Sequence, residues 1–236
     1  MRCALTIAYN GTTYLGSQTQ KSSPNTILGN LEKVLNALGI KSKVIASGRT
    51  DKGVHATGQI CHIDLPPFWD NVVKLKKVLN EMLPSSIEVR SIKTVSDDFH
   101  ARYGAKKRVY RYIIKKAKSN PFTDDFITYD ETIDFERVEK NIETFVGEHD
   151  FAYFMKTGSE TKSSVRVIYR AFAYKYKDYI VLHFEANGFL RSQIRLMVGA
   201  LMKFDEKELQ EQLQMLKKHP LKPAKSNGLY LAKIKY

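Results

Sequence analysis

The sequence has few cysteines and no long hydrophobic run. Only Cys3 and Cys61 occur among its 236 residues, too few for a disulfide scaffold or a cysteine-rich zinc site. No apolar run reaches the roughly 18 residues that a transmembrane helix needs. The first residues also lack the length and the cleavage site of a secretory signal. We therefore expect a cytoplasmic protein with no membrane contact, in which both thiols are reduced and buried.

Motifs of the common cofactor and metal enzymes are missing as well. There is no G-x-x-x-x-G-K-[ST] loop and no G-x-G-x-x-G after a strand, which argues against a nucleotide cofactor. No H-E-x-x-H and no pair of C-x-x-C motifs occurs, which argues against a zinc enzyme. The G-x-S-x-G elbow of serine hydrolases is also absent. We expect neither a cofactor nor a metal.

Acidic residues are missing from two basic stretches of the chain. The formal net charge is +13, from 38 Lys and Arg against 25 Asp and Glu. Residues 102–118 hold eight basic side chains and three tyrosines without an acid, and residues 217–236 hold six lysines without an acid. One interpretation is a solvated lysine surface. Interleaved arginine and tyrosine instead favour nucleic acid, because these side chains contact phosphates and stack on bases.

Hydrophobic periodicity predicts the same order of elements twice, β-α-β-β-α-β. In the first half the pattern predicts strands over 2–9, 43–47, 58–65 and 87–95, and helices over 26–38 and 70–82. In the second half it predicts strands over 107–116, 165–176, 179–186 and 229–235, helices over 134–146 and 189–203, and an extra helix over 205–218. The expected fold is α+β, with two tandem ferredoxin-like units over 1–100 and 101–236. We expect antiparallel sheets and a ligand-binding cleft between the units.

One polar loop gathers several reactive side chains. It runs from Ser47 to Ala56 between two predicted strands, and Arg49, Asp51, Lys52 and His55 fall within seven of its residues. Two glycines in it allow a close approach of the backbone to a ligand, and loops held by rigid strands often carry catalytic groups. The alternative is a turn in which Asp51 caps backbone amides and Arg49 is a solvated charge.

Motifs along almost the whole chain resemble the tRNA pseudouridine synthase A (TruA) family. The matching motifs are Tyr9-Asn10-Gly11-x-x-Tyr14-x-Gly16-x-Gln18, Gly48-Arg49-Thr50-Asp51-x-Gly53-Val54-His55-Ala56, Asp98-Phe99-His100-Ala101-Arg102, Arg108-x-Tyr110-Arg111-Tyr112, Gly147-x-His149-Asp150-Phe151, Asn187-x-Phe189-Leu190, Arg195-x-x-Val198-Gly199 and Ala224-Lys225-x-x-Gly228-Leu229-Tyr230-Leu231. The sequence departs from the family at Ser17, where tryptophan is usual, near Leu28, where the family has glutamine, and at 191–193, where histidines are common. These departures bear on how RNA is held and which uridines are preferred.

The resemblance implies an isomerase that converts uridine to pseudouridine at positions 38–40 of the tRNA anticodon arm. It implies no cofactor, a tRNA partner and a homodimer. Asp51 is then the nucleophile, Arg49 and Arg195 favour its charged form, and Tyr110 stacks on uracil or accepts a proton. The residues expected to contact the substrate are Tyr110, Arg49, Lys52, His55, Arg102, Arg108 and Phe189.

Structural roles remain open for several of these residues. Arg49 and Arg195 could form structural ion pairs, and Tyr110 could be a core aromatic, because Tyr112 shares its strand face. His55 suits a hydrogen bond within the loop better than catalysis.

Two other functions also remain open. One is an RNA-binding module without chemistry. The other is a metal-dependent nuclease that would use Asp51 and His55 with Asp64 or Asp150.

Overall fold

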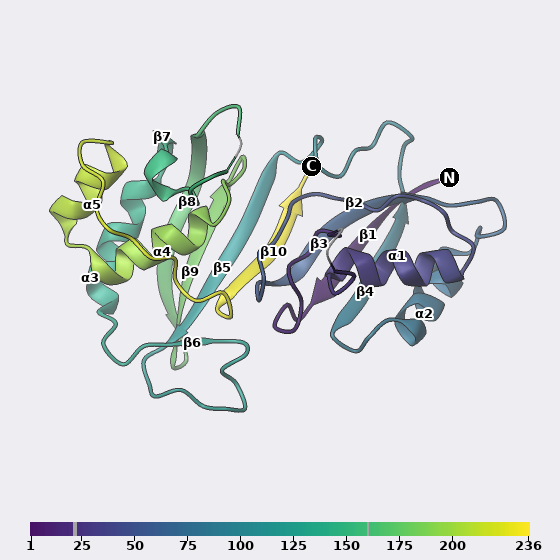
Figure 1. The fold of residues 1–236 in the computed structure, drawn as a ribbon, viewed down its shortest axis with the longest axis horizontal. Coiled ribbons are helices and arrows are strands. Elements are labelled where there is room, and N and C mark those ends of the chain that lie inside the picture. The colour runs from purple at the N-terminus through teal and green to yellow at the C-terminus, as the bar shows by residue number, and fades with distance from the viewer. Residues whose placement is uncertain (21–22, 160) are drawn as a thin grey trace. The chain divides into compact units, whose positions relative to one another are not determined.

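The structure, a computed structural model, describes residues 1–20, 23–159 and 161–236. It divides into two compact units, which are described one at a time (Figure 1). Unit 1 comprises Met1–Lys106 together with Tyr230–Tyr236, and unit 2 comprises Lys107–Leu229. Both mix helices with mostly antiparallel strands, as the α+β prediction requires. The division into independent domains over 1–100 and 101–236 stays a prediction, as does the ferredoxin-like topology of each half.

Unit 1 contains two helices and the strands that carry the polar loop. Its elements are β1 (Arg2–Tyr9), α1 (Ile27–Ala37), β2 (Ile45–Ala46), β3 (His55–Asp64), α2 (Val72–Met82), β4 (Ile87–Thr94) and nearly all of β10 (Leu229–Lys235). Strand β1 lies between β3 and β4, antiparallel to both. Strand β2 pairs with β3 at Ile45 and His62.

The last strand differs from the expectation of purely antiparallel sheets. Strand β10 runs parallel to the beginning of β3, with Tyr230 opposite His55. The strands are therefore mostly antiparallel, as expected, and β10 is an exception. Strand β3 also begins at His55 rather than at residue 58. His55 and Ala56 thus belong to a strand, and the polar loop ends earlier than predicted.

The core of unit 1 follows from the two periodicities in its sequence. Strand β1 alternates between half-buried and buried residues, so Cys3, Leu5 and Ile7 face inward. Helix α1 buries Leu28, Leu31 and other residues of one stripe. In Figure 1, α1 and α2 lie beside one another over the strands, and they are in contact.

Unit 2 carries the remaining strands and helices. Its elements are β5 (Lys107–Lys115), β6 (Thr128–Tyr129), α3 (Phe135–Ile142), the 3-10 turns η1 (Glu143–Phe145) and η2 (Ala152–Phe154), β7 (Gly147–Asp150), β8 (Val165–Tyr176), β9 (Tyr179–Ala186), α4 (Gln193–Lys203) and α5 (Glu206–Leu213). The strands follow the order β5-β9-β8-β7, with antiparallel neighbours, and β6 pairs in parallel with β5. Helix α3 packs on β8 and on α4. The short strands β6 and β7 were not predicted.

Three helices of unit 2 are shorter than predicted. Helix α3 ends at Ile142 rather than at 146, and the 3-10 turn η1 follows it. Helix α4 begins at Gln193 rather than at 189, because Ser192 before it has a left-handed φ of 59°. Helix α5 begins with a capping box formed by Asp205 and Glu208 and ends at Leu213, ahead of the left-handed Met215. Of the helix predicted over 205–218, only Glu206–Leu213 is therefore α-helical. No helix within the described part of the chain is long and apolar enough to span a membrane.

Candidate active site

The polar loop of unit 1 is fastened at its first residues by one buried side chain of β3. Gln59 is fully buried; its Oε1 accepts from Ser47 Oγ at 2.5 Å, and its Nε2 donates to Gly48 O at 2.8 Å. The Ser47 N–H donates to Ile60 O at 2.8 Å. The loop therefore leaves β2 in a fixed direction.

The middle of the loop is held by Ser17 and Tyr9. The Thr50 N–H donates to Ser17 Oγ at 2.8 Å, and the Ser17 N–H donates to Thr50 O at 3.1 Å. Thr50 Oγ1 and Tyr9 Oη share a buried hydrogen bond of 2.9 Å. A methyl group at Gly16 would lie 2.9 Å from Thr50 O, so glycine is needed for this close approach. Thr50 is thus the buried anchor of the loop.

A tight turn closes the loop at its far end. The Val54 N–H donates to Asp51 O at 3.2 Å, and Gly53 has a φ of 77° at the third position of that turn. The Gly11 N–H donates to His55 Nδ1 at 3.1 Å. A methyl group at Gly11 would lie 2.0 Å from Val54 O. The turn is therefore pressed against the segment that follows β1.

These hydrogen bonds determine which side chains of the loop are exposed to solvent. Thr50 is buried, whereas Arg49 and Lys52 are exposed and Asp51 is partly exposed. Asp51 makes contacts within the protein. His55 is only 1% exposed and stacks on Tyr230 with ring centroids 4.7 Å apart. That position suits the hydrogen-bonding role considered for His55, and its contact with substrate stays a prediction.

Arg102 lies on the surface of unit 1, in the segment between β4 and β5. Its guanidinium carbon lies 5.7 Å from the centre of the Tyr103 ring, and Tyr103 is 79% exposed. The His100 ring accepts the Arg102 and Tyr103 N–H groups at its Nδ1, both at 3.2 Å. The segment thus presents a cation and an aromatic ring together.

In unit 2, two tyrosines of β5 differ in how their surroundings hold them. Tyr112 is fully buried, and its hydroxyl bonds Thr128 Oγ1 at 2.7 Å and Lys225 O at 2.8 Å. Burial raises the pKa of Tyr112 to about 12. Tyr110 is 8% exposed and meets Phe189 edge-on, with ring centroids 5.3 Å apart. Two hydrogen bonds within unit 2 therefore fix the Tyr112 hydroxyl.

Arg195 and Arg108 are both held by backbone carbonyls of unit 2. Arg195, on α4, donates from Nε to Ala224 O at 2.8 Å, and its own carbonyl accepts the Ala224 N–H at 2.8 Å. A methyl group at Gly199, one turn along α4, would lie 2.3 Å from Lys222 O, so the segment before β10 lies tightly on this helix. Arg108 donates from Nη1 to Asn187 O at 2.7 Å. Each guanidinium therefore has a defined position.

The predicted site residues are shared between the units. Arg49, Asp51, Lys52, His55 and Arg102 belong to unit 1. Tyr110, Arg108, Phe189 and Arg195 belong to unit 2. Within unit 2 the structure brings Tyr110 and Phe189 together. The meeting of Asp51 with Arg195 in a cleft stays a prediction.

Comparisons with known proteins address the function directly. A family model described as tRNA pseudouridine synthase matches residues 5–104 and 142–236. The chain belongs to the tRNA pseudouridine synthase family. It is 37% identical over 241 residues to a tRNA pseudouridine synthase A of Campylobacter jejuni (strain RM1221), with all of both chains covered. It is 38% identical to one of Helicobacter hepaticus, over 98% of this chain and 97% of that one.

Among solved structures, a Cbf5-Nop10-Gar1 complex gives a TM-score of 0.37 at 11% identity. It covers 83% of this chain and 43% of that chain, and a likeness this low carries no argument. The membership rests on the sequence relatives, and it makes the chain an isomerase that forms pseudouridine.

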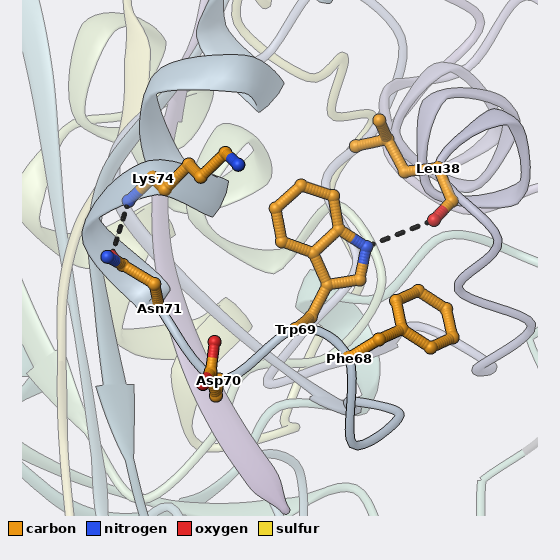
Figure 2. A pocket seen from close by; sticks show the side chains of 6 residues that line it. All are labelled: Leu38, Phe68, Trp69, Asp70, Asn71 and Lys74. Atoms are coloured by element: carbon orange, nitrogen blue, oxygen red, sulfur yellow. Dashed lines mark hydrogen bonds between the residues drawn. The ribbon is translucent and has the colours of Figure 1, made fainter.

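The hollow shown in Figure 2 is not part of the predicted site of this synthase. It lies in unit 1 where α1 ends and α2 begins, and its lining residues are Leu38, Phe68, Trp69, Asp70, Asn71 and Lys74. Trp69 Nε1 donates to Leu38 O at 3.0 Å, and Asn71 caps α2 by accepting the Lys74 N–H at 2.9 Å. The bond from Trp69 to Leu38 joins the two helix ends, which is a structural role.

The nuclease alternative depends on where the acidic side chains of the described residues lie. No three His, Cys, Asp or Glu side chains of residues 1–20, 23–159 and 161–236 are placed to hold one metal ion. Asp64 instead forms a bidentate pair with Arg2, at 2.8 Å and 3.0 Å. The hydrogen bond from Arg2 lowers the pKa of the Asp64 carboxyl. This pairing with Arg2 counts against Asp64 as a metal ligand.

Sequence reasoning missed two residues that position the loop of the synthase. Ser17 was noted only as a departure from the family, and Gln59 was not singled out. A buried glutamine in a strand that is otherwise apolar on its inner face is a usable signal, because such a group needs hydrogen-bond partners. Ser17 carried no comparable signal, since its partner lies 33 residues away.

Proposed function

We propose that this synthase acts on uridines 38–40 in the anticodon arm of tRNA, with Asp51 as the nucleophile. The observation that carries the proposal is the fastening of residues 47–55. Ser17 holds the backbone of Thr50, Gln59 holds the carbonyl of Gly48, and Tyr9 holds the Thr50 side chain. The loop therefore presents Asp51 between the exposed Arg49 and Lys52 at little cost in conformational freedom. The family resemblance supplies the substrate positions.

The reaction is an isomerisation whose atoms balance without a co-reactant. The N1–C1′ bond of uridine breaks, the uracil turns, and a C5–C1′ bond forms. C5 loses its hydrogen, and N1 gains a proton. Attack by a carboxylate divides this change into two easier steps, because a covalent adduct holds the fragment between them.

The remaining residues have distinct roles in the proposal. Arg195 comes to Asp51 from unit 2 and, with Arg49, favours the ionised carboxylate. The target base must leave its stack, which costs a few kcal/mol, and Arg49 fills the vacated space. Tyr110 stacks on the uracil or accepts a proton, with Phe189 beside it. The same resemblance supports a cytoplasmic homodimer.

Tritium release from C5-labelled uridine in tRNA tests the proposal. Wild-type protein is expected to release tritium in the presence of EDTA, and Asp51→Asn is expected to release none while it still binds tRNA. Asp70→Asn is the matched control, since Asp70 is an exposed carboxylate of the same unit, and it should behave as wild type.

Other outcomes favour the other functions. Equal release by wild type and Asp51→Asn would refute the nucleophile. Tight tRNA binding with no release by either protein would favour a binding module. Shortened RNA whose formation stops with EDTA would favour a nuclease.

A further inference from the structure

A second arginine of unit 2 lies beside Arg108, on the strand face that carries Tyr110. Ala186 of β9 pairs with Arg108 of β5 on one side and with Ile168 of β8 on the other. Residues directly opposite one another point to the same face of a sheet, as do residues two apart on one strand. Arg166, two residues before Ile168, therefore shares a face with Arg108 and Tyr110.

Three consecutive residues join these side chains. Asn187 is pinned to β8, because its N–H donates to Val167 O and its Oδ1 accepts the Val167 N–H, both at 3.1 Å. The Asn187 carbonyl accepts from Arg108 at 2.7 Å. Arg166 lies against Gly188, where a methyl group would be 3.7 Å from Nε. Phe189 then contacts Tyr110. The guanidiniums of Arg108 and Arg166 thus lie along the segment 187–189, which ends at Phe189 beside Tyr110, the residue proposed to stack on uracil.

Arg166 is held by backbone carbonyls near it in the sequence. Its Nη1 donates to the carbonyls of Ser163 and Val165, at 2.9 Å and 2.6 Å. Within the described ranges 1–20, 23–159 and 161–236, no carboxylate forms an ion pair with it. Burial lowers the pKa of Arg166, and the nearby charge of Arg108 lowers it further. A partly buried cation such as Arg166, with no carboxylate partner among the described residues, favours the approach of an anion.

We propose that Arg166, together with Arg108, binds a backbone phosphate of the tRNA next to the uridine held at Tyr110 and Phe189. The planar guanidinium suits a phosphate, because it offers parallel N–H donors to two oxygens. Arg166 is a positioning residue here, since it acts on the phosphate and not on the reacting atoms. The inference rests on the proposed function for the place of the uridine, and on the geometry of unit 2 for the phosphate site.

The salt dependence of tRNA binding gives the first test. Loss of one phosphate contact reduces the slope of log K against log salt by about 1, and Arg166→Gln is expected to do so while weakening affinity about tenfold. Arg166→Lys should recover the slope but only part of the affinity, because lysine keeps the charge and loses the planar fork.

Arg170→Gln is the matched control from the same strand. Arg170 is exposed and lies 5.2 Å from the Phe172 ring centre. It pairs with Glu185, whereas Tyr110 pairs with the next residue, Phe184, so Arg170 points to the other face. Arg170→Gln should keep the wild-type slope. An unchanged slope in Arg166→Gln, or an equal loss in both variants, would overturn the inference.

Methylphosphonate substitution in the RNA identifies the phosphate. Replacing single phosphates on either side of the target uridine by a neutral methylphosphonate should weaken wild-type binding strongly at one position. At that position Arg166→Gln should lose nothing more, because the two changes remove the same contact. Additive losses at every position would overturn the inference, and so would the absence of a sensitive position in the wild type.

The outcomes separate this inference from the proposed function. Tritium release by wild type with additive binding losses leaves the proposed function standing and removes Arg166 from the phosphate site. Absence of tritium release by wild type refutes the proposed function. The binding of methylphosphonate RNA by wild type and Arg166→Gln still decides whether Arg166 contacts a phosphate. If Arg166→Gln unfolds at the same temperature as wild type, the variant is folded and its change in binding is local.

Discussion

Replacing Ser17 with alanine tests how the loop over residues 47–55 is held. The change removes one buried acceptor, the Oγ that receives the Thr50 N–H at 2.8 Å. The backbone bond from the Ser17 N–H to Thr50 O remains. A buried N–H left without a partner costs about 1–3 kcal/mol, so the free energy of unfolding should fall by about that amount.

The same energy should appear in activity. If the loop moves to give the Thr50 N–H another partner, the population with Asp51 in place falls by about 5- to 150-fold. We expect kcat for tritium release to fall within that range, with a smaller change in KM, because in the proposed mechanism Asp51 acts in the chemical step and not in most of the tRNA contact. Urea unfolding and steady-state kinetics measure the two quantities.

Ser86→Ala is the matched control for Ser17→Ala. Ser86 Oγ bonds Tyr14 Oη at 2.6 Å in the same unit, and this hydrogen bond involves no residue of 47–55. This variant should lose about 0.5–1.5 kcal/mol of stability and keep the wild-type kcat. If Ser17→Ala matches wild type in both stability and kcat, Ser17 does not hold Thr50 and the account of the loop fails.

Two further substitutions test the neighbouring structure. Tyr112→Phe removes a hydroxyl with two internal partners. In urea unfolding it should lower the free energy of unfolding by about 1–3 kcal/mol and leave kcat within about twofold of wild type. A large loss of kcat without loss of stability would show that Tyr112 acts in the reaction. For His62, burial lowers the pKa below its ordinary value of 6.5, and Nδ1 must accept the Ala101 N–H. The unfolded chain therefore binds the proton first as pH falls through 6.5, so stability should be full above that pH and decline below it. His62→Gln should show a shallower decline between pH 7 and 5, and a decline as steep as that of wild type would place the titrating group elsewhere.

Local patterns predicted the elements whose burial has a regular period. The stripe of leucines over α1 and the alternation over β1 are visible in the sequence because each element packs one face on a core. The Arg49–Asp51 loop was located in the same way, from polar residues and glycines between two apolar runs. These parts needed no knowledge of distant residues.

The parts that were missed depend on distant partners. His55 begins β3 because Tyr230 pairs with it and Gly11 donates to it, and neither is near it in the sequence. Strands β6 and β7 are too short to show a period, and they exist through pairing with β5 and β8. The start of α4 is set by the left-handed backbone at Ser192, which the apolar pattern beginning at 189 does not reveal.

The most direct test uses a tRNA in which only uridines 38, 39 and 40 carry tritium at C5. Wild-type protein and Asp51→Asn are incubated with this RNA in parallel, without added metal, and released tritium is counted. The account predicts release by wild type, none by Asp51→Asn, and equal binding of the RNA by both. Release by Asp51→Asn at the wild-type rate, or no release by wild type from these three positions, would contradict it.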